Sequence, residues 1–464
     1  MKKNKYTNEQ LMRSVPVRQA VLQLSLPTLL GALMGLVYNL TDTLFISLLR
    51  DTAQIASLSL AMPVTWLLSA AGAIIAAGAP SYISRKYGAG DLDAVRRCSA
   101  FAVYATMALG LVATAAMLPL LNGMLGLMGA SGATLPYARS YLNVLIAFSV
   151  VNLGQGTLQG LLRAEGKTKA ASFGGILGIV TNIVLDPLFI FALRLGIRGA
   201  ALATAMGYVV SAIYYFVKLR AGGTVLSIRL RDCRPDRAMV KDIVAVGSAS
   251  ALSTLIVCVP MLIGNRFAAG YGDQLLAAVG IASKVFSIVA TIASGFAMGL
   301  QPFIGYNHGA GQRSRMLRGM LCSAAIGTAM CLVGEVIFAL CPRFLIGLFS
   351  DDPEVVGFGA RMLRYFLIYI PFIAVDMTMT TYLSATGRAM QATVLTLVKQ
   401  VVLFVPLMLV LMRFMGADGM MLAQPLASLP TTALAAVLTA AAMKKDLREG
   451  RDWAAMPKGC QEAA

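Results

Sequence analysis

The chain has 464 residues, of which 58% are hydrophobic and only 13% are charged. Soluble globular domains are far less apolar, and the apolar stretches here recur along the whole length, so the sequence predicts an integral membrane protein. The net charge of +18 would suit a nucleic-acid partner, but most of the Lys and Arg residues fall in the two termini and in every second predicted loop. That pattern follows membrane topology, so we expect no nucleic acid to bind.

Segments of about 20 apolar residues are long enough to cross a bilayer as helices. In chain order, the twelve predicted spans lie near 17–49, 53–79, 98–121, 134–162, 170–193, 196–219, 243–268, 275–300, 317–342, 362–385, 391–412 and 417–443. An even number of spans places both termini on one side, and the basic residues identify that side as the cytoplasm. We therefore expect a multi-pass protein of the cell inner (cytoplasmic) membrane with both termini cytoplasmic.

Short glycine-containing motifs recur at nearly one spacing. The pairs 88–90 with 309–311 and Gly166 with Gly387 are 221 residues apart, and Gly199 with Gly419 is 220 apart. A fixed offset in corresponding loops indicates an internal repeat. Each half then holds six spans in the same orientation, so we predict an all-α fold of two six-helix lobes related by a pseudo-two-fold axis along the membrane normal. The predicted lobes are 1–220 and 241–464, joined by a basic cytoplasmic loop at 221–240.

Asp186 is the one charge in the apolar run 170–193. A carboxylate at that depth costs about 2.5–3.5 kcal/mol on insertion scales, so such a residue usually faces a cavity and has a function. Asn182 lies one helical turn earlier, on the same helix face. The alternative is a structural carboxylate satisfied by Asn182 and the neighbouring backbone.

Four further groups are predicted at the same depth as Asp186, in the outer half of the first, fifth and sixth spans. They are Asp42, Asn182, the carbonyl of Ala200 and the hydroxyl of Thr204. Hard oxygen ligands of this kind suit Na⁺, and a pair of close carboxylates also suits a proton. The sequence therefore predicts a cation-coupling site and leaves Na⁺ and H⁺ open. Asp42 alone would also fit an interfacial residue.

Other polar residues in spans have less defined roles. Glu335 lies near the outer end of the ninth span, at a depth similar to that of Lys284, with which it would pair. Asp376 corresponds to Gln155 at the repeat offset, and two roles fit it, a substrate contact and a helix-packing hydrogen bond. The candidates for a substrate cavity are Tyr38, Asn39, Gln155 and Asp376. His308, the only histidine, is predicted in a loop, where a pH-sensing role is the lesser of two alternatives.

Seven dispersed cysteines with no C-x-x-C spacing and a single histidine offer no cluster of nucleophile, base or metal ligands, so the sequence does not predict an enzyme. Pro27, in the middle of the first span, removes a backbone hydrogen bond and allows a bend, either fixed or moving. A channel also remains open as an alternative.

Several segments resemble the multidrug and toxic compound extrusion family. They are Pro27 followed by YNLTDTLF, then LLRAEGK, NIVLDPLFIF, GIRGAALAT, GFAMGLQPFIGYNHGAG and SATGRA. Their order and their placement in the spans cover nearly the whole chain. The resemblance implies twelve helices in two lobes, alternating access, and export of amphipathic, often cationic, organic compounds in exchange for Na⁺ or H⁺.

Carried over by position, the family's cation site falls on Asp42, Asn182, Asp186, Ala200 and Thr204, and Pro27 becomes the hinge of the first span. These ligands would form the metal site if the ion is Na⁺. The resemblance also implies a monomer among membrane lipids, with no tightly bound cofactor. The seventh predicted span lacks the glutamate that several relatives use, so the resemblance gives no role to Glu335 or Asp376. A related alternative is a flippase of lipid-linked saccharides, but arginines are nearly absent from the spans.

Overall fold

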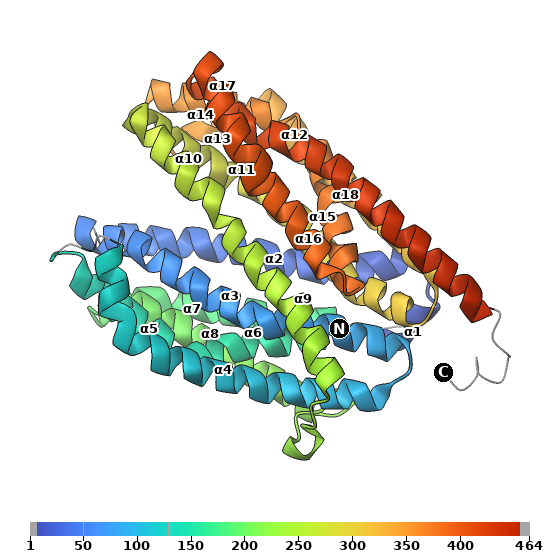
Figure 1. Ribbon diagram of the computed structural model, residues 1–464. Helices are drawn as coiled ribbons and strands as arrows, with labels where there is room; N and C mark the ends of the chain where they lie inside the picture. Colours follow the sequence, from blue (N-terminus) through green and yellow to red (C-terminus); the bar gives the residue numbers. More distant parts are fainter. Residues whose placement is uncertain (1–6, 50, 129, 131, 455–464) are drawn as a thin grey trace. The chain divides into compact units, whose positions relative to one another are not determined.

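The computed structural model describes residues 7–49, 51–128, 130 and 132–454, and it is helical throughout, with no strand in that part of the chain (Figure 1). The helices up to the middle of the chain are α1 (Asn8–Arg13), α2 (Val17–Ser47), α3 (Thr52–Gly88), α4 (Leu92–Leu127), α5 (Leu135–Ala147), α6 (Ser149–Ala164), α7 (Thr168–Pro187), the π-helical turn η1 (Leu188–Ala192), α8 (Ile197–Arg220) and the short η2 (Leu230–Asp232).

The second half repeats this order. Its helices are α9 (Arg237–Ile256), α10 (Cys258–Gly270), α11 (Asp273–Gly309), α12 (Arg313–Leu340), α13 (Pro342–Gly347), α14 (Pro353–Phe366), α15 (Ile370–Ala385), α16 (Ala389–Leu397), the π-helical η3 (Val398–Leu403), α17 (Phe404–Met415) and α18 (Ala417–Ala454). The segment predicted as an inter-lobe loop at 221–240 therefore ends in helix, because α9 already begins at Arg237. His308 lies in the last turn of α11 and not in a loop.

Ten helices of the described chain are long and apolar enough to cross a membrane, and the number rises to twelve if two bent pairs each count as one span. The pairs are α5 with α6, bent by 53°, and α14 with α15, bent by 58°. They coincide with the fourth and tenth predicted spans, which we expected to be continuous. Several helices also run well past the apolar segment; α3 and α11 each have 37 residues.

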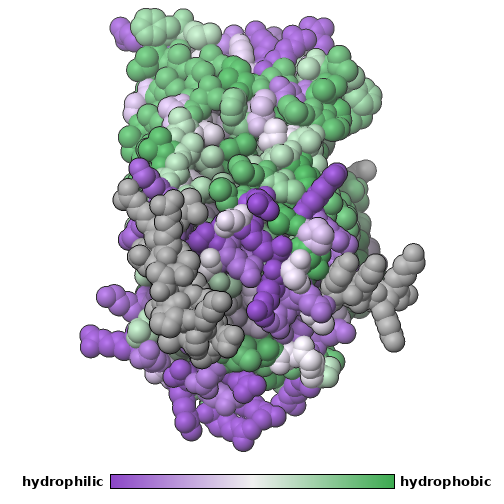
Figure 2. All heavy atoms as spheres, turned by 90° about the vertical axis from the view of Figure 1, so that its right-hand side faces the viewer, coloured by the Kyte–Doolittle hydropathy of each residue, from purple (hydrophilic) through white to green (hydrophobic). Residues whose placement is uncertain are grey.

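Large apolar side chains lie on the surface, as expected for helices in contact with lipid. On α4, Leu111, Val112 and Leu120 are each more than 60% exposed. Figure 2 shows broad areas of hydrophobic side chains on the face that it draws. The protein is thus a multi-pass membrane protein, whose interior combines alanine with larger aliphatic and aromatic side chains.

The φ angles of glycines in the connections between helices also follow the internal repeat. In the first half, the glycines with positive φ include Gly90 at 80°, Gly166 at 85° and Gly196 at 55°. Their counterparts 220 or 221 residues later are Gly311 at 68°, Gly387 at 84° and Gly416 at 57°. Because residues with a Cβ rarely adopt positive φ, glycine is required where the chain turns between spans in both halves.

The described chain forms two compact units. One runs from Leu30 to Ala251 and includes the segment up to Met12; the other comprises Arg13–Leu29 and the chain from Leu252 onward. The boundaries therefore fall inside α2 and inside α9. In the first unit, α3, α4 and α6 pack along one another (Figure 1).

The connection after α8 is held on the first unit by polar contacts. The Glu165 side chain accepts hydrogen bonds from Thr224 Oγ1 at 2.6 Å and from the backbone N–H of Val225 at 3.1 Å. Tyr104 Oη donates to the Ile228 carbonyl at 3.0 Å. These contacts satisfy backbone groups that a loop would otherwise leave to water.

Close helix contact at Gly247 gives a stability prediction. A Cβ on Gly247 of α9 would lie 1.7 Å from the Ile74 carbonyl oxygen of α3, so Gly247→Ala must push two helix backbones apart. We expect a loss of about 1–3 kcal/mol, measured as a lower unfolding temperature of the purified protein in detergent. Gly264→Ala is the matched control, because no atom lies within 4 Å of its built Cβ. Equal stability of the two variants would contradict the packing.

Candidate functional site

Three helices of the first unit bring polar groups together at one level. On α7, Asn182 and Asp186 are four residues apart and both are buried. On α8, Ala200 and Thr204 have the same spacing and are also buried. A spacing of four places each pair on one helix face. Side-chain hydrogen bonds bring Asn182, Asp186 and Thr204 together, and Tyr38 of α2 joins them.

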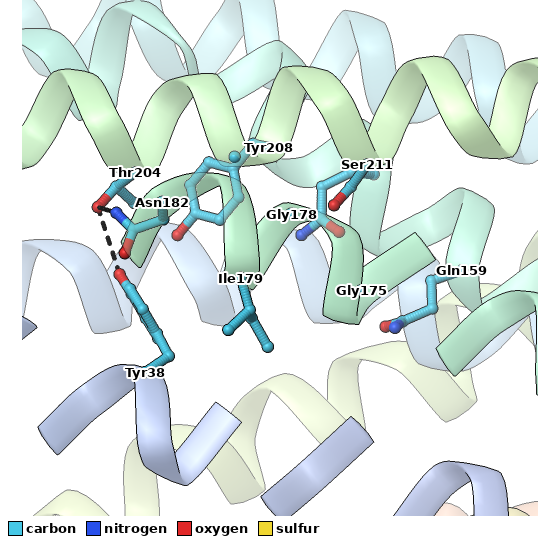
Figure 3. A pocket seen from close by; sticks show the side chains of 11 residues that line it. Tyr38, Gln159, Gly175, Gly178, Ile179, Asn182, Thr204, Tyr208 and Ser211 are labelled. Carbon is cyan, nitrogen blue, oxygen red and sulfur yellow. Dashed lines mark hydrogen bonds between the residues drawn. The ribbon is translucent and has the colours of Figure 1, made fainter. Parts of the chain in front are cut away.

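Asn182 is the centre of the hydrogen-bond network. Its Nδ2 donates to Asp186 Oδ1 at 3.3 Å and to Thr204 Oγ1 at 3.2 Å. The Thr204 hydroxyl is also 3.3 Å from Tyr38 Oη, which comes from α2. Figure 3 shows Tyr38 reaching toward Thr204 and Asn182 from the opposite side of the pocket. The network therefore ties α2, α7 and α8 together through side chains.

Three buried oxygen atoms of this cluster have no hydrogen-bond partner in the described chain. They are Asp42 Oδ1, Asn182 Oδ1 and Asp186 Oδ2. A buried unsatisfied acceptor costs about 1–3 kcal/mol, and more when it is charged. Oxygen acceptors that no donor satisfies are of the kind that bind a small cation or carry a proton.

The two carboxylates are close enough to interact electrostatically, Asp42 from α2 and Asp186 from α7. Tyr141 of α5 lies within electrostatic range of both. Tyr208 of α8 interacts in the same way with Asp42. Like charges in a medium of low dielectric constant repel strongly, so a cation or a proton between them is stabilised by both groups.

A cavity of about 230 Å³ adjoins the cluster. Its lining residues come from α2, α6, α7 and α8, and they are Tyr38, Gln155, Gln159, Gly175, Gly178, Ile179, Asn182, Thr204, Gly207, Tyr208 and Ser211. None of them carries a formal charge. The wall is therefore uncharged and mainly apolar, with aromatic and amide side chains able to contact an organic molecule.

Small residues on α7 and α8 make this geometry possible. A Cβ at Gly178 would lie 2.1 Å from Ser211 Oγ and 2.6 Å from the Gly207 carbonyl oxygen. Ser211 Oγ also donates to the Gly174 carbonyl at 2.9 Å. The two helices therefore approach closely, as small residues allow in membranes, and Asn182 reaches Thr204 across the contact.

The candidates for the substrate cavity fall in different places. Tyr38 and Gln155 line the cavity. Asn39 is exposed, and its Nδ2 donates to the Gly35 carbonyl of its own helix at 2.9 Å. Asp376 belongs to the second unit, where it contacts Lys399 at 3.0 Å. Asn39 and Asp376 are not among the residues that line this cavity.

The expected pair of Glu335 and Lys284 does not form. No ion pair joins these two described residues, and Glu335 Oε2 is buried without a hydrogen-bond partner. Lys284 is exposed on α11. Similar depth in the membrane was not sufficient, because neighbouring helices must also present the two side chains to each other.

Sequence reasoning missed several residues of the site. Tyr208 and Ser211 follow Thr204 by four and seven residues, so helical spacing alone would have placed them on the same face. Gln159 follows the predicted Gln155 by four residues on α6, so the same spacing would have found it, whereas no sequence signal points to Tyr141 of α5. No group of three or more His, Cys, Asp or Glu residues in the described chain is arranged to hold a metal ion. A transition-metal centre is therefore not supported, whereas two carboxylates with neutral oxygens suit Na⁺.

Comparison with known proteins agrees with this architecture. The family model MatE matches residues 27–188 and 249–410, and the two matches begin 222 residues apart. The multidrug export protein MepA of Staphylococcus aureus is 28% identical over 88% of this chain and 90% of its own. A crystal structure of MATE in complex with MaL6 superposes with a TM-score of 0.91 at 25% identity, covering 96% of this chain and 100% of that one.

A second solved structure, the outward-facing conformation of a multidrug resistance MATE family transporter of the MOP superfamily, has a TM-score of 0.90 at 25% identity with the same coverage. The double match covers well over half of the sequence, so the chain belongs to the MatE family. It is a membrane transporter and not an enzyme.

Proposed function

We propose that the protein is a secondary antiporter that exports amphipathic, often cationic, organic compounds in exchange for Na⁺ or H⁺ by alternating access. The observation that carries the proposal is the set of three unpartnered buried oxygens on Asp42, Asn182 and Asp186. The similarity to a multidrug export protein supports efflux of organic molecules. The charge distribution favours a cell inner membrane location with both termini in the cytoplasm.

In this proposal the coupling cation binds Asp42, Asn182, Asp186, Thr204 and the Ala200 carbonyl. An ion shared by α2 and α7 draws the two carboxylates together and changes the packing of α2 against the cavity wall. The hydrogen bond between Tyr38 and Thr204 links that movement to the cavity. Cation binding then drives substrate release only to the extent that the cation binds one conformation of the transporter more tightly than the other.

Pro27 is the proposed hinge of α2. It lies inside the helix, and the division between the two compact units follows two residues later, after Leu29. A proline removes one backbone hydrogen bond, so a bend there costs less than elsewhere in the helix. We propose that the two segments of α2 change their angle at this point during transport.

The neutral cavity favours organic compounds over lipid-linked saccharides. Recognition of a diphosphate would call for Arg or Lys in the wall, and the lining residues include neither. Apolar and aromatic side chains such as Ile179 and Tyr208 instead suit aromatic or hydrophobic molecules. We expect the transporter to act as a monomer surrounded by lipid.

Efflux from vesicles tests the proposal directly. The purified protein is reconstituted into proteoliposomes, and the vesicles are loaded with a panel of fluorescent cationic dyes. Inward Na⁺ and pH gradients are then imposed separately. We expect saturable dye export driven by one of these gradients and abolished by the matching ionophore; an electrical component would add about 2.3 kcal/mol per charge per 100 mV. Dye flux that ignores both gradients, or that rises linearly without saturation, would reject the antiporter.

A further inference from the structure

A second buried charge cluster lies in the second unit. Lys399 Nζ donates to Asp376 Oδ2 at 3.0 Å and to Tyr369 Oη at 2.6 Å, and Tyr369 Oη donates to the same carboxylate oxygen at 2.7 Å. The Lys399 and Asp376 side chains are 13% and 10% exposed. The ammonium also lies 4.4 Å from the centre of the Tyr369 ring, within cation–π range. This is a site built for an ammonium group.

The internal repeat relates this cluster to the cavity of the first unit. At the offset of 221, Asp376 is the counterpart of the cavity-lining Gln155, and at 220, Gln424 is the counterpart of Thr204. Gln424 Nε2 donates to Gln400 Oε1 at 3.2 Å, next to Lys399 in the chain. A charged group of the chain thus lies among residues whose counterparts surround a cavity in the first unit.

Tyr369 occupies a corresponding position as well. It stands between α14 and α15, at the break of one bent pair, and its counterpart Phe148 stands between α5 and α6 at the other. Phe148 has no hydroxyl, whereas the Tyr369 hydroxyl donates a hydrogen bond to Asp376 and accepts one from Lys399. The second half therefore offers a carboxylate and a hydroxyl to an ammonium where the first half has Gln155 and Phe148.

The two units also differ in how their buried carboxylates are balanced. No Lys or Arg pairs with Asp42 or Asp186 among the described residues, and each has an oxygen without a partner. Asp376, by contrast, already has an ammonium within hydrogen-bond distance. A buried carboxylate needs a counter-charge, so the first unit must take it from solution whereas the second carries its own.

We propose that Lys399 is a tethered cation: its ammonium fills a primary-ammonium site formed by Asp376 and Tyr369, so that this site holds no exchangeable ion. If this site holds no exchangeable ion, ion exchange is confined to the first unit. That consequence for transport rests on the proposed function. The binding site itself does not depend on that function and is tested without transport.

The test replaces the tethered group with a free one. Lys399→Ala retains Cβ and removes the equivalent of n-propylammonium, so the purified full-length variant is titrated with n-propylammonium chloride while its unfolding temperature is followed. We expect a saturable rise of roughly 3 °C or more for K399A and none for the wild type at equal ionic strength. The double variant K399A/D376N should not respond, and tetramethylammonium, which is bulkier and has no N–H donor, should not replace the probe. A K399A protein that responds no more than the wild type, or a response that survives D376N, overturns the proposal.

A second variant covers the case in which K399A does not fold. K399M/D376N removes both charges at similar volume, and such neutral replacements of buried ion pairs usually preserve stability. We expect it to fold and to keep the dependence of dye efflux on the ion gradient, whereas loss of that dependence would show that exchange passes through Asp376 and would overturn the proposal. An Asp186 variant that keeps gradient-driven efflux would instead contradict the proposed coupling site and leave the ammonium titration unaffected.

Discussion

Asp186→Asn is expected to abolish ion-driven efflux while leaving a folded protein in the membrane. The amide has nearly the same shape as the carboxylate, so packing on α7 is kept, but the charge that attracts the cation is lost. A contact with a charged group contributes about 1.5–3 kcal/mol. That corresponds to a roughly 10- to 100-fold weaker cation affinity. Asp42→Asn should have the same effect, because both carboxylates belong to the proposed coupling site and each has an unpartnered oxygen.

The measurement is dye efflux in proteoliposomes under the gradient that drives the wild type. Glu335→Gln is the matched control: Glu335 is also a carboxylate in an apolar helix with an unpartnered buried oxygen, but it lies on α12 of the second unit. We expect it to keep its response to the gradient. Undiminished, gradient-dependent efflux in both aspartate variants would reject the cation site, and equal losses in all three would show that any intramembrane carboxylate is needed.

The spans were predictable because hydropathy depends on composition alone. Their interruptions were less visible. The break between α14 and α15 is followed by Pro371, which offers a sequence signal. The break at Phe148 has neither proline nor glycine beside it, so it arises from tertiary packing that no local pattern records. Helix ends beyond the apolar segment, such as Arg85 and Lys86 within α3, were missed for a related reason: an apolar window stops where the charges begin.

In the candidate site, too, some residues were predictable from the sequence and others were not. Asp186 was conspicuous because a single carboxylate in an apolar run is costly, and Asn182 followed from helical spacing. The aromatic residues Tyr141 and Tyr208 were not conspicuous, since tyrosines are common packing residues in membrane helices. The pairing of Asp376 with Lys399 joins α15 to the π-helical η3. A π-helical turn shifts the helix register, and therefore the face on which a side chain lies, in a way that regular spacing does not predict.

Asp446→Asn is expected to cause the largest loss of stability among single substitutions in the second unit. The Asp446 side chain is fully buried. It accepts hydrogen bonds from Tyr382 Oη at 2.6 Å and from Arg388 at 3.0 Å and 2.5 Å. The bond to this carboxylate also raises the pKa of the Arg388 guanidinium. Together these contacts fasten α18 to α15 and to the turn that follows α15.

Removing the charge leaves the guanidinium without its counter-ion. Breaking a buried ion pair from one side costs about 3–5 kcal/mol, because the remaining charge stays desolvated. Asp93→Asn is the matched control, since its ion pair with Arg97 is solvent-exposed and such pairs contribute about 0–1 kcal/mol. We expect a large fall in unfolding temperature in detergent for D446N and almost none for D93N, with Tyr382→Phe between them because it loses one hydrogen bond and no charge. Equal stability of D446N and D93N would contradict the prediction. It would mean that water solvates Arg388 in the variant and that this network does not hold α18 against its neighbours.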